Sequence, residues 1–316
     1  MKLIIGTRGS ALALWQARFV AETIEKRHPQ VHVELITIKT RGDKILDTPL
    51  ATIGGKGLFT KEIEDALLEK RVDLAVHSMK DLPTDLPDGL RLAAVMERED
   101  PRDVFISRDS RSLAELSAGE RIGTSSLRRK AFLLHSFPGL EVISIRGNVD
   151  TRLRKIETEN LAGVVLAAAG IRRMGVADRV TTYLDPDFMI PAIGQGALAI
   201  ETRAGDSQTN GIVEALNHAI TAQCVHIERA FLKRLGGGCQ VPIAAHCVCD
   251  GDEIRVTAAV AHPDGDPVVR DAFEGSASDA NVGVALADSL IRQGADSILR
   301  DVLASDWQPV PINELI

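Results

Sequence analysis

The stretch KRLGGGCQVPIAAHC, residues 233–247, sets one cysteine, Cys239, directly after three glycines and three residues before a proline. Glycine admits backbone conformations that other residues avoid, while Pro242 fixes its own φ and favours an extended Val241. Cys239 is therefore predicted to lie on a tight, non-helical loop. Either it is an incidental small residue of a turn, or its thiol is held where a bulky group must approach it. The second interpretation makes Cys239 a candidate for chemistry.

A second signal is the positive charge gathered between Arg121 and Arg173, where ten cations stand against four carboxylates in a chain of net charge −7. Many of these cations stand between predicted strands and helices, where the loops of doubly wound sheets line a ligand crevice. Arginine binds carboxylate or phosphate in a planar, bidentate geometry. The cleft is therefore predicted to bind a ligand with several negative groups. The ten cations are Arg121, Arg128, Arg129, Lys130, Arg146, Arg152, Arg154, Lys155, Arg172 and Arg173.

Hydroxyl side chains gather at two predicted helix starts: Thr7, Ser10, Thr124, Ser125 and Ser126. A helix N-terminus presents unpaired N–H groups and the positive end of the helix dipole, which suits an anion. Serine and threonine are also ordinary N-caps, and capping alone is the simpler interpretation. The nearby arginines favour anion binding as the alternative.

Lys80 and Asp81 follow the third predicted strand, in the segment VHSMKDLPTDLP, residues 76–87. They stand at the carboxyl end of that strand, where ligands bind in such sheets. Asp81 could simply cap the turn before Pro83. In a cleft otherwise full of cations, however, a carboxylate would repel a polyanion. Asp81 is therefore predicted to stabilise a cation or to move a proton.

The Gly/Thr-rich segment TRGDKILDTPLATIGGKGLFTKE, residues 40–62, is a candidate lid. Lys56 and Phe59 would reach from it over the cleft. A disordered surface loop is the alternative, and composition alone supports it nearly as well.

The elements that position these residues follow from hydrophobic periodicity. Strand-like and helical runs alternate at the N-terminus, which predicts an α/β unit with a largely parallel sheet: 3–6, 11–27, 31–38, 58–71 and 73–78. A second unit begins near Pro101, with strands at 103–107, 121–126, 141–145 and 163–169 and helices near 127–136 and 148–158. A helix at 221–235, three strand-like runs joined by hairpin turn signals and a helical tail predict a third, α+β unit with an antiparallel sheet.

The segments IIGTRGSALALWQA (4–17) and RIGTSSLRRKAFLL (121–134) share one pattern: strand, Gly-Thr, polar loop, helix. As a sequence repeat the match is weak. It nevertheless predicts two similar lobes, each aiming a helix N-terminus at a shared cleft.

Composition excludes several classes of protein. The net charge of −7 argues against nonspecific nucleic-acid binding. No segment reaches the roughly 18 apolar residues of a membrane span, and MKLIIGTRGS lacks the features of a secretory signal, so a cytoplasmic protein is expected. A disulfide framework is not expected there. The spacing in HCVC (246–249) is poor for zinc, and we predict no metal site.

Together these motifs resemble the porphobilinogen deaminase (hydroxymethylbilane synthase) family. The matching segments run in order through essentially the whole chain: GTRGSALALWQ, GGKGLFTKEIE, DLAVHSMKDLP, RIGTSSLRR, IRGNVDTRLRK, AAAGIRRMG, IGQGALAIE and GGGCQVPIA. Each alone is weak, but eight in sequence are highly specific.

The resemblance implies two α/β lobes like those of periplasmic binding proteins and a smaller α+β C-terminal domain with a three-stranded antiparallel sheet. The predicted boundaries are 1–98 with 196–217 for domain 1, 99–195 for domain 2, and 218–316 for domain 3. Domain 3 carries Cys239.

The resemblance also implies a transferase of tetrapyrrole biosynthesis. Four porphobilinogens, each with an acetate and a propionate arm, are joined head to tail with loss of ammonia, and water releases linear hydroxymethylbilane. The implied cofactor is dipyrromethane, covalently attached to Cys239. The product is expected to pass to uroporphyrinogen-III synthase, and the protein is expected to be a monomer with no nucleic-acid or membrane partner.

By matching motifs, the resemblance assigns Asp81 as the catalytic residue. Its carboxylate would stabilise the cationic methylenepyrrolenine left by loss of ammonia and the cation formed by the next attack, and would shuttle protons. The implied cofactor-binding residues are Cys239, Ser10, Ser78, Lys80, Asp81, Thr124, Ser126, Arg128, Arg129 and Arg152. Incoming substrate or the growing chain is expected at Arg8, Gln16, Arg146, Arg173, Lys56 and Phe59.

Two other functions remain open. A non-catalytic binding protein for a small polyanion could use the same two-lobed fold, but Cys239 and Asp81 would then have no required role. A cysteine-nucleophile hydrolase would need a histidine partner for Cys239. His246 lies seven residues further on, and nothing in the motif positions it.

Overall fold

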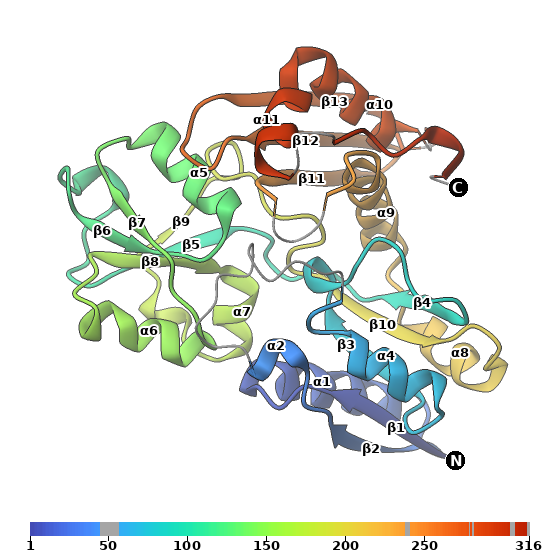
Figure 1. Cartoon of the computed structure of the whole chain (residues 1–316). Helices are drawn as coiled ribbons and strands as arrows, with labels where there is room; N and C mark the ends of the chain where they lie inside the picture. Colours follow the sequence, from blue (N-terminus) through green and yellow to red (C-terminus); the bar gives the residue numbers. More distant parts are fainter. Residues whose placement is uncertain (45–56, 238–240, 278, 280, 304–306, 315–316) are drawn as a thin grey trace.

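The computed structural model describes residues 1–44, 57–237, 241–277, 279, 281–303 and 307–314. Within them the chain forms three sheets, each covered by its own helices (Figure 1). The predicted class is confirmed: two α/β lobes and a smaller α+β unit with a three-stranded antiparallel sheet. The domain boundaries given above stay a prediction. Among the described helices, none has the length and apolar character needed to cross a bilayer.

The first lobe is built on a five-stranded sheet of order β2-β1-β3-β10-β4. β1 pairs in parallel with β2 and β3, whereas β10 runs antiparallel to both β3 and β4. The sheet is thus mixed rather than largely parallel as predicted, because β10 returns to it only after the second lobe. The strands are β1 (Lys2–Thr7), β2 (His32–Thr37), β3 (Leu74–Ser78), β4 (Leu90–Val95) and β10 (Leu198–Arg203).

The helices of this lobe cover its sheet. Ala17, Val20 and Ile24 of the first helix are buried in one core with Leu3 and Ile5 of β1. The helix predicted at 58–71 is shorter, at 61–68. The helical elements are α1 (Ala11–Arg27), α2 (Arg41–Lys44), α4 (Lys61–Leu68), the 3₁₀ turn η1 (Met79–Asp81) and α8 (Ser207–Val213).

The second lobe repeats the first topology with the order β7-β6-β8-β5-β9. Here β6 is parallel to β7 and β8, and β5 is antiparallel to β8 and β9. The two similar lobes predicted from the pattern shared by residues 4–17 and 121–134 are therefore present. The elements are β5 (Asp103–Ser107), β6 (Arg121–Gly123), α5 (Leu127–Ser136), β7 (Glu141–Ile143), α6 (Val149–Thr158), β8 (Gly163–Ala167), α7 (Ala168–Arg173) and β9 (Thr182–Tyr183).

Two strands predicted in this lobe end early. The strand predicted at 121–126 stops at Gly123, because the Ser126 side chain accepts the Arg129 N–H and starts α5. The strand predicted at 163–169 stops at Ala167, where α7 begins. Both differences shorten the strand and bring a helix start closer to the sheet.

The third unit packs helices on the antiparallel sheet β11-β12-β13. Its elements are α9 (Ala219–Arg234), β11 (Ile243–Asp250), β12 (Glu253–Ala261), β13 (Val268–Ser276), α10 (Val282–Leu290), the π-helical turn η5 (Ile291–Ala295) and α11 (Asp296–Val302). The remaining short 3₁₀ turns are η2 (Leu113–Glu115), η3 (Ala177–Arg179), η4 (Glu214–Leu216) and η6 (Ile312–Glu314).

Glu228 of α9 anchors this unit to the two segments that cross between the lobes, one containing Arg98 and the other containing Gly194. Its Oε1 lies 2.9 Å from Arg98 Nη1 and accepts the Cys247 N–H at 2.9 Å, while Oε2 accepts the Gly194 N–H at 2.7 Å. Burial raises the pKa of this carboxyl, but Arg98 and His246 bring it below its usual range. Both lobe crossings are therefore tied to α9 by one ionised carboxylate.

The close packing of α9 against α10 gives a stability prediction. A Cβ at Gly283 would lie 2.2 Å from the Ile227 carbonyl oxygen and 2.9 Å from the Phe231 nitrogen. Gly283→Ala should therefore lower the free energy of unfolding by about 1–3 kcal/mol, measured by denaturant titration. The control is Gly211→Ala in α8, where no described atom beyond its chain neighbours and its own helix backbone lies within 4 Å of the new methyl, and where helix propensity favours alanine. Unchanged stability in Gly283→Ala would contradict the packing described here.

Candidate active site

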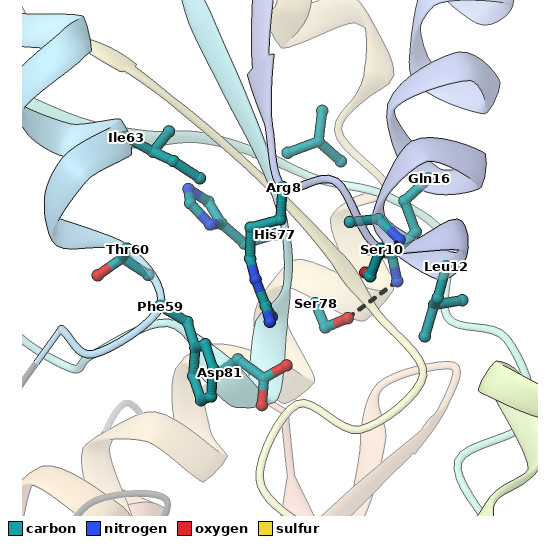
Figure 2. Close-up of a pocket in the computed structure, with 12 residues that line it drawn as sticks. Arg8, Ser10, Leu12, Gln16, Phe59, Thr60, Ile63, His77, Ser78 and Asp81 are labelled. Atoms are coloured by element: carbon teal, nitrogen blue, oxygen red, sulfur yellow. Dashed lines mark hydrogen bonds between the residues drawn. The ribbon is translucent and has the colours of Figure 1, made fainter. Parts of the chain in front are cut away.

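A pocket opens on the first lobe between the start of α1, the end of β3 and the segment before α4 (Figure 2). It brings together residues that are far apart in the sequence. Six of the predicted site residues line it: Arg8, Ser10, Gln16, Phe59, Ser78 and Asp81. Of the other predicted residues, Lys56 and Cys239 lie outside the described part of the chain.

The two serines of this pocket are held by local hydrogen bonds. The Ser10 hydroxyl accepts the Ala13 N–H at 3.3 Å and caps α1. Buried Gln16 donates from Nε2 to Ser78 Oγ at 2.9 Å (Figure 2). Ser10 thus has the capping contact expected in the simpler interpretation, and Gln16 fixes the hydroxyl at the end of β3.

Arg8 is held between an aromatic ring and a carboxylate. Its guanidinium lies 4.2 Å from the centroid of the Phe59 ring, and its Nε donates to Asp43 Oδ1 at 3.1 Å. Burial raises the pKa of Asp43, but hydrogen bonds from Arg8 and Thr40 lower it below its usual range. A ligand carboxylate that reaches Arg8 must therefore compete with Asp43, a residue that sequence reasoning missed.

Lys80 and Asp81 lie together in the turn η1, directly after β3. Asp81 is exposed toward the pocket, beside Phe59 (Figure 2). Half-buried Lys80 donates from Nζ to Gln195 Oε1 at 3.3 Å. Burial and the charge of Arg129 lower the pKa of Lys80 to about 8, against the opposing effect of Asp81.

Arg128 and Arg129 of α5 are buried and share the carboxylate of Asp103. Arg129 donates to Asp103 Oδ1 from Nε at 3.0 Å and from Nη2 at 2.8 Å, while Arg128 Nη1 lies 2.7 Å from Oδ2. Asp103 is fully buried, which raises its pKa, but the charges of the two arginines hold that pKa far below the usual range. The expectation that Asp81 is the one carboxylate among these cations is therefore wrong.

Thr124 and Ser126 organise the start of α5. Buried Thr124 accepts the Ser126 N–H at 3.3 Å, and Ser126 accepts the Arg129 N–H at 3.4 Å. Both hydroxyls thus shape the turn from which the buried arginines project.

Arg152 extends this cluster of cations. Its Nε donates to the Gly147 carbonyl at 2.9 Å. Burial, followed by the charge of Arg129, lowers its pKa to about 10, and Arg146 acts in the same direction. Cations from two strand-to-helix junctions of the second lobe, β6–α5 and β7–α6, therefore act on one another.

Arg173 makes its contacts elsewhere. Its Nη2 donates to the Gly196 carbonyl at 2.7 Å, and its guanidinium lies 5.9 Å from the centroid of the Trp15 ring on α1. Burial lowers its pKa to about 10. Arg173 thus bridges the lobes at the contact between α1 and α7.

Besides Asp43 and Asp103, sequence reasoning missed Gln195 and a buried contact between a histidine and a glutamate. Gln195 lies in the motif IGQGALAIE but had no role assigned to it, although it contacts Lys80. His77 Nε2 lies 2.9 Å from Glu201 Oε2 behind the pocket, and both residues are buried. The available signal was a charged or polar residue inside an apolar strand, as in DVFIS, LAVHS and LAIET.

The arrangement suits a ligand with several carboxylates. Lys80 and Arg152 carry charges that burial disfavours, and Arg128 Nε is buried without a hydrogen-bond partner among the described residues. Carboxylate oxygens would neutralise these cations and satisfy this donor. The fold and site thus define a two-lobed protein with a polycarboxylate-binding cleft.

Comparison with known proteins supplies the family. Residues 3–211 match the model described as "Porphobilinogen deaminase, dipyromethane cofactor binding domain", and residues 222–292 match "Porphobilinogen deaminase, C-terminal domain". The chain is 56% identical over 302 residues to the porphobilinogen deaminase of Trichlorobacter lovleyi, covering 95% of this chain and 96% of that protein. It is 51% identical over 311 residues to that of Syntrophotalea carbinolica, covering 98% of each. The chain belongs to the porphobilinogen deaminase family.

The solved structures that align with this chain are more distant. A TRAP periplasmic solute binding protein from Desulfovibrio salexigens is 11% identical, with a TM-score of 0.42 over 69% of this chain and 72% of that one. The L-cystine solute receptor of Neisseria gonorrhoeae is 13% identical, with a TM-score of 0.39 over 76% and 94%.

The lowered pKa of Lys80 can be measured directly. In the chain without cofactor, one lysine should titrate near pH 8, whereas ordinary lysines titrate near about 10.4. Bound carboxylates favour the charged amine, so they should raise this pKa, and anion affinity should fall as the pH rises through 8. NMR of reductively ¹³C-methylated lysines measures the titration, and Lys80→Met assigns the signal. If every lysine titrated above pH 10, the burial of Lys80 would be wrong.

Proposed function

We propose that this chain joins four porphobilinogen molecules head to tail, releases four molecules of ammonia, and uses water to release linear hydroxymethylbilane. The observation that carries the proposal is the position of Asp81. Its carboxylate faces a pocket whose neighbouring cations suit the acidic arms of pyrroles. A cation formed during the reaction would therefore meet a carboxylate, while the acidic arms meet arginine and lysine.

The family description supplies a dipyrromethane cofactor, and the cluster of buried cations fits its acid groups. When bound, this group supplies the pyrrole carbon to which the first substrate is joined. We propose that it is attached through the thiol of Cys239. The residues proposed to hold it are Ser10, Ser78, Lys80, Asp81, Thr124, Ser126, Arg128, Arg129 and Arg152.

The position of α9 supports the attachment at Cys239, which follows that helix in the sequence. Arg229 of α9 donates to three successive carbonyls just after Asp81: those of Leu82 at 3.1 Å, Pro83 at 2.6 Å and Thr84 at 3.1 Å. The helix that leads toward Cys239 is thus bound to the turn that carries the catalytic carboxylate.

Substrate is proposed to enter the pocket of the first lobe. Arg8 would exchange Asp43 for an acid group of porphobilinogen, and Phe59 would cover the pyrrole. Gln16, Arg146, Arg173 and Lys56 complete the proposed substrate-binding set.

Asp81 is proposed to act on the substrate in two ways. Ammonia leaves with the electron pair of the C–N bond, and the methylenepyrrolenine that remains is cationic. The Asp81 carboxylate stabilises this charge through the pyrrole N–H. After the new C–C bond has formed, the carboxylate takes up the α-proton that leaves and passes it to solvent.

We further propose that the protein is a cytoplasmic monomer and that its product passes to uroporphyrinogen-III synthase. Both follow from the expected pathway and from the composition of the chain.

Intact mass tests the covalent attachment. The purified protein should exceed its sequence mass by two pyrrole units, and Cys239→Ser should lack this excess because it lacks the thiol. Cys249→Ser is the matched control and should keep it, since Cys249 lies in β11. A fully active wild-type chain of unmodified mass would exclude the attachment and with it the enzyme as proposed.

Asp81→Asn tests the catalytic carboxylate. The amide is isosteric, so the fold and the added mass should be retained, while kcat should fall by about 10²–10⁴-fold. Asp88→Asn, at an exposed carboxylate in the same segment, should stay near the wild-type rate. Steady-state rates of porphobilinogen consumption make the comparison, and a near-normal rate in Asp81→Asn would remove Asp81 from the mechanism.

A further inference from the structure

Asp103 lies in the first position of β5, fully buried beneath the proposed cofactor-binding arginines. Its two oxygens have different partners. Oδ1 accepts two hydrogen bonds from Arg129, at 3.0 and 2.8 Å, and Oδ2 lies 2.7 Å from Arg128 Nη1. One carboxylate thus separates and orients two adjacent guanidinium groups.

Without this carboxylate the two arginines would repel each other. Burial lowers the pKa of Arg129, and the neighbouring charge of Arg128 lowers it further, while Asp103 opposes both effects. Buried like charges need a counter-ion at short range, because water is not there to screen them. Asp103 meets that need from within the protein before any ligand binds.

Asp103 also reaches the first lobe through Gln195. The Gln195 side chain donates from Nε2 to Asp103 Oδ1 at 3.0 Å and accepts from Lys80 Nζ at 3.3 Å. It donates as well to the Pro101 carbonyl at 2.7 Å, so it fastens the two lobe crossings to each other. The hydrogen bonds that link Asp103, Gln195 and Lys80 therefore fix the position of Lys80 in the first lobe relative to the two arginines of the second lobe.

The arginines keep donors for a ligand despite these bonds. A guanidinium carries five N–H groups. Arg129 donates from Nε and Nη2 to Asp103 and from Nη1 to the Val165 carbonyl. Each of its two Nη atoms carries a second N–H that these bonds do not use. Arg128 Nε has no hydrogen-bond partner among the described residues. Asp103 therefore orients the arginines without exhausting them.

We infer that Asp103 is a positioning residue for loading of the dipyrromethane: it holds Arg128 and Arg129 apart and, through Gln195, places Lys80 opposite them. This inference rests on the proposed function. Asp103 does not touch the reacting atoms; it acts through the cations that hold the acid groups.

The test is the rate of loading per folded chain. Wild type, Asp103→Asn and Asp100→Asn are produced in cells that make no porphobilinogen, and porphobilinogen is then added. Intact mass follows the gain of two pyrrole units, and circular dichroism gives the folded fraction. Asp100 is the matched control because it lies on the same crossing and pairs with Arg102 at 2.7 Å and Arg172 at 3.6 Å, not with Arg128 or Arg129.

Asp103→Asn should load at least about tenfold more slowly per folded chain, whereas Asp100→Asn should load like wild type. A purely structural role would lower the folded fraction and leave the rate per folded chain unchanged. That result would overturn the inference. If Asp103→Asn does not fold, Asp103→Glu decides: it keeps the charge but shifts it by one methylene, and loading at the wild-type rate per folded chain would overturn the inference. A wild-type chain that gains no mass refutes the proposed function itself.

Discussion

The structure depends on gathering several positive charges in a cleft that is partly closed to water. Burial opposes the charges of Lys80 and Arg152 and lowers their pKa values to about 8 and about 10. The protein offsets this with few carboxylates, among them the fully buried Asp103. The remaining positive charge is what a ligand with several acid groups neutralises. The affinity for such a ligand and the electrostatic cost of the cations without it thus have the same origin.

The topology explains how these charges come together. Each lobe has the same strand order, and in each a capped helix follows a central parallel strand: α1 after β1 and α5 after β6. Loops at the carboxyl ends of such strands face a common crevice. Two chain crossings and α9 fix the distance across it, because Glu228 binds both crossings.

The local pattern of the sequence predicted most of the elements and the charge of the cleft. It did not predict the mixed sheets, because β10 joins the first sheet from more than a hundred residues downstream and periodicity carries no pairing information. It also missed Asp103 and Gln195. Their roles arise from contacts across 26 and 115 residues, to Arg129 and Lys80, which only the folded chain brings together.

The hydrogen bonds from Arg229 to the carbonyls of Leu82, Pro83 and Thr84 have a consequence for how the protein can move. They make the turn of Asp81 and the helix α9 one rigid block. A chain that lengthens by whole pyrrole rings cannot find room by separating these two parts while the three hydrogen bonds hold. Room for the added length would then have to come from other parts of the protein, while the carboxylate proposed to be catalytic keeps its place relative to α9.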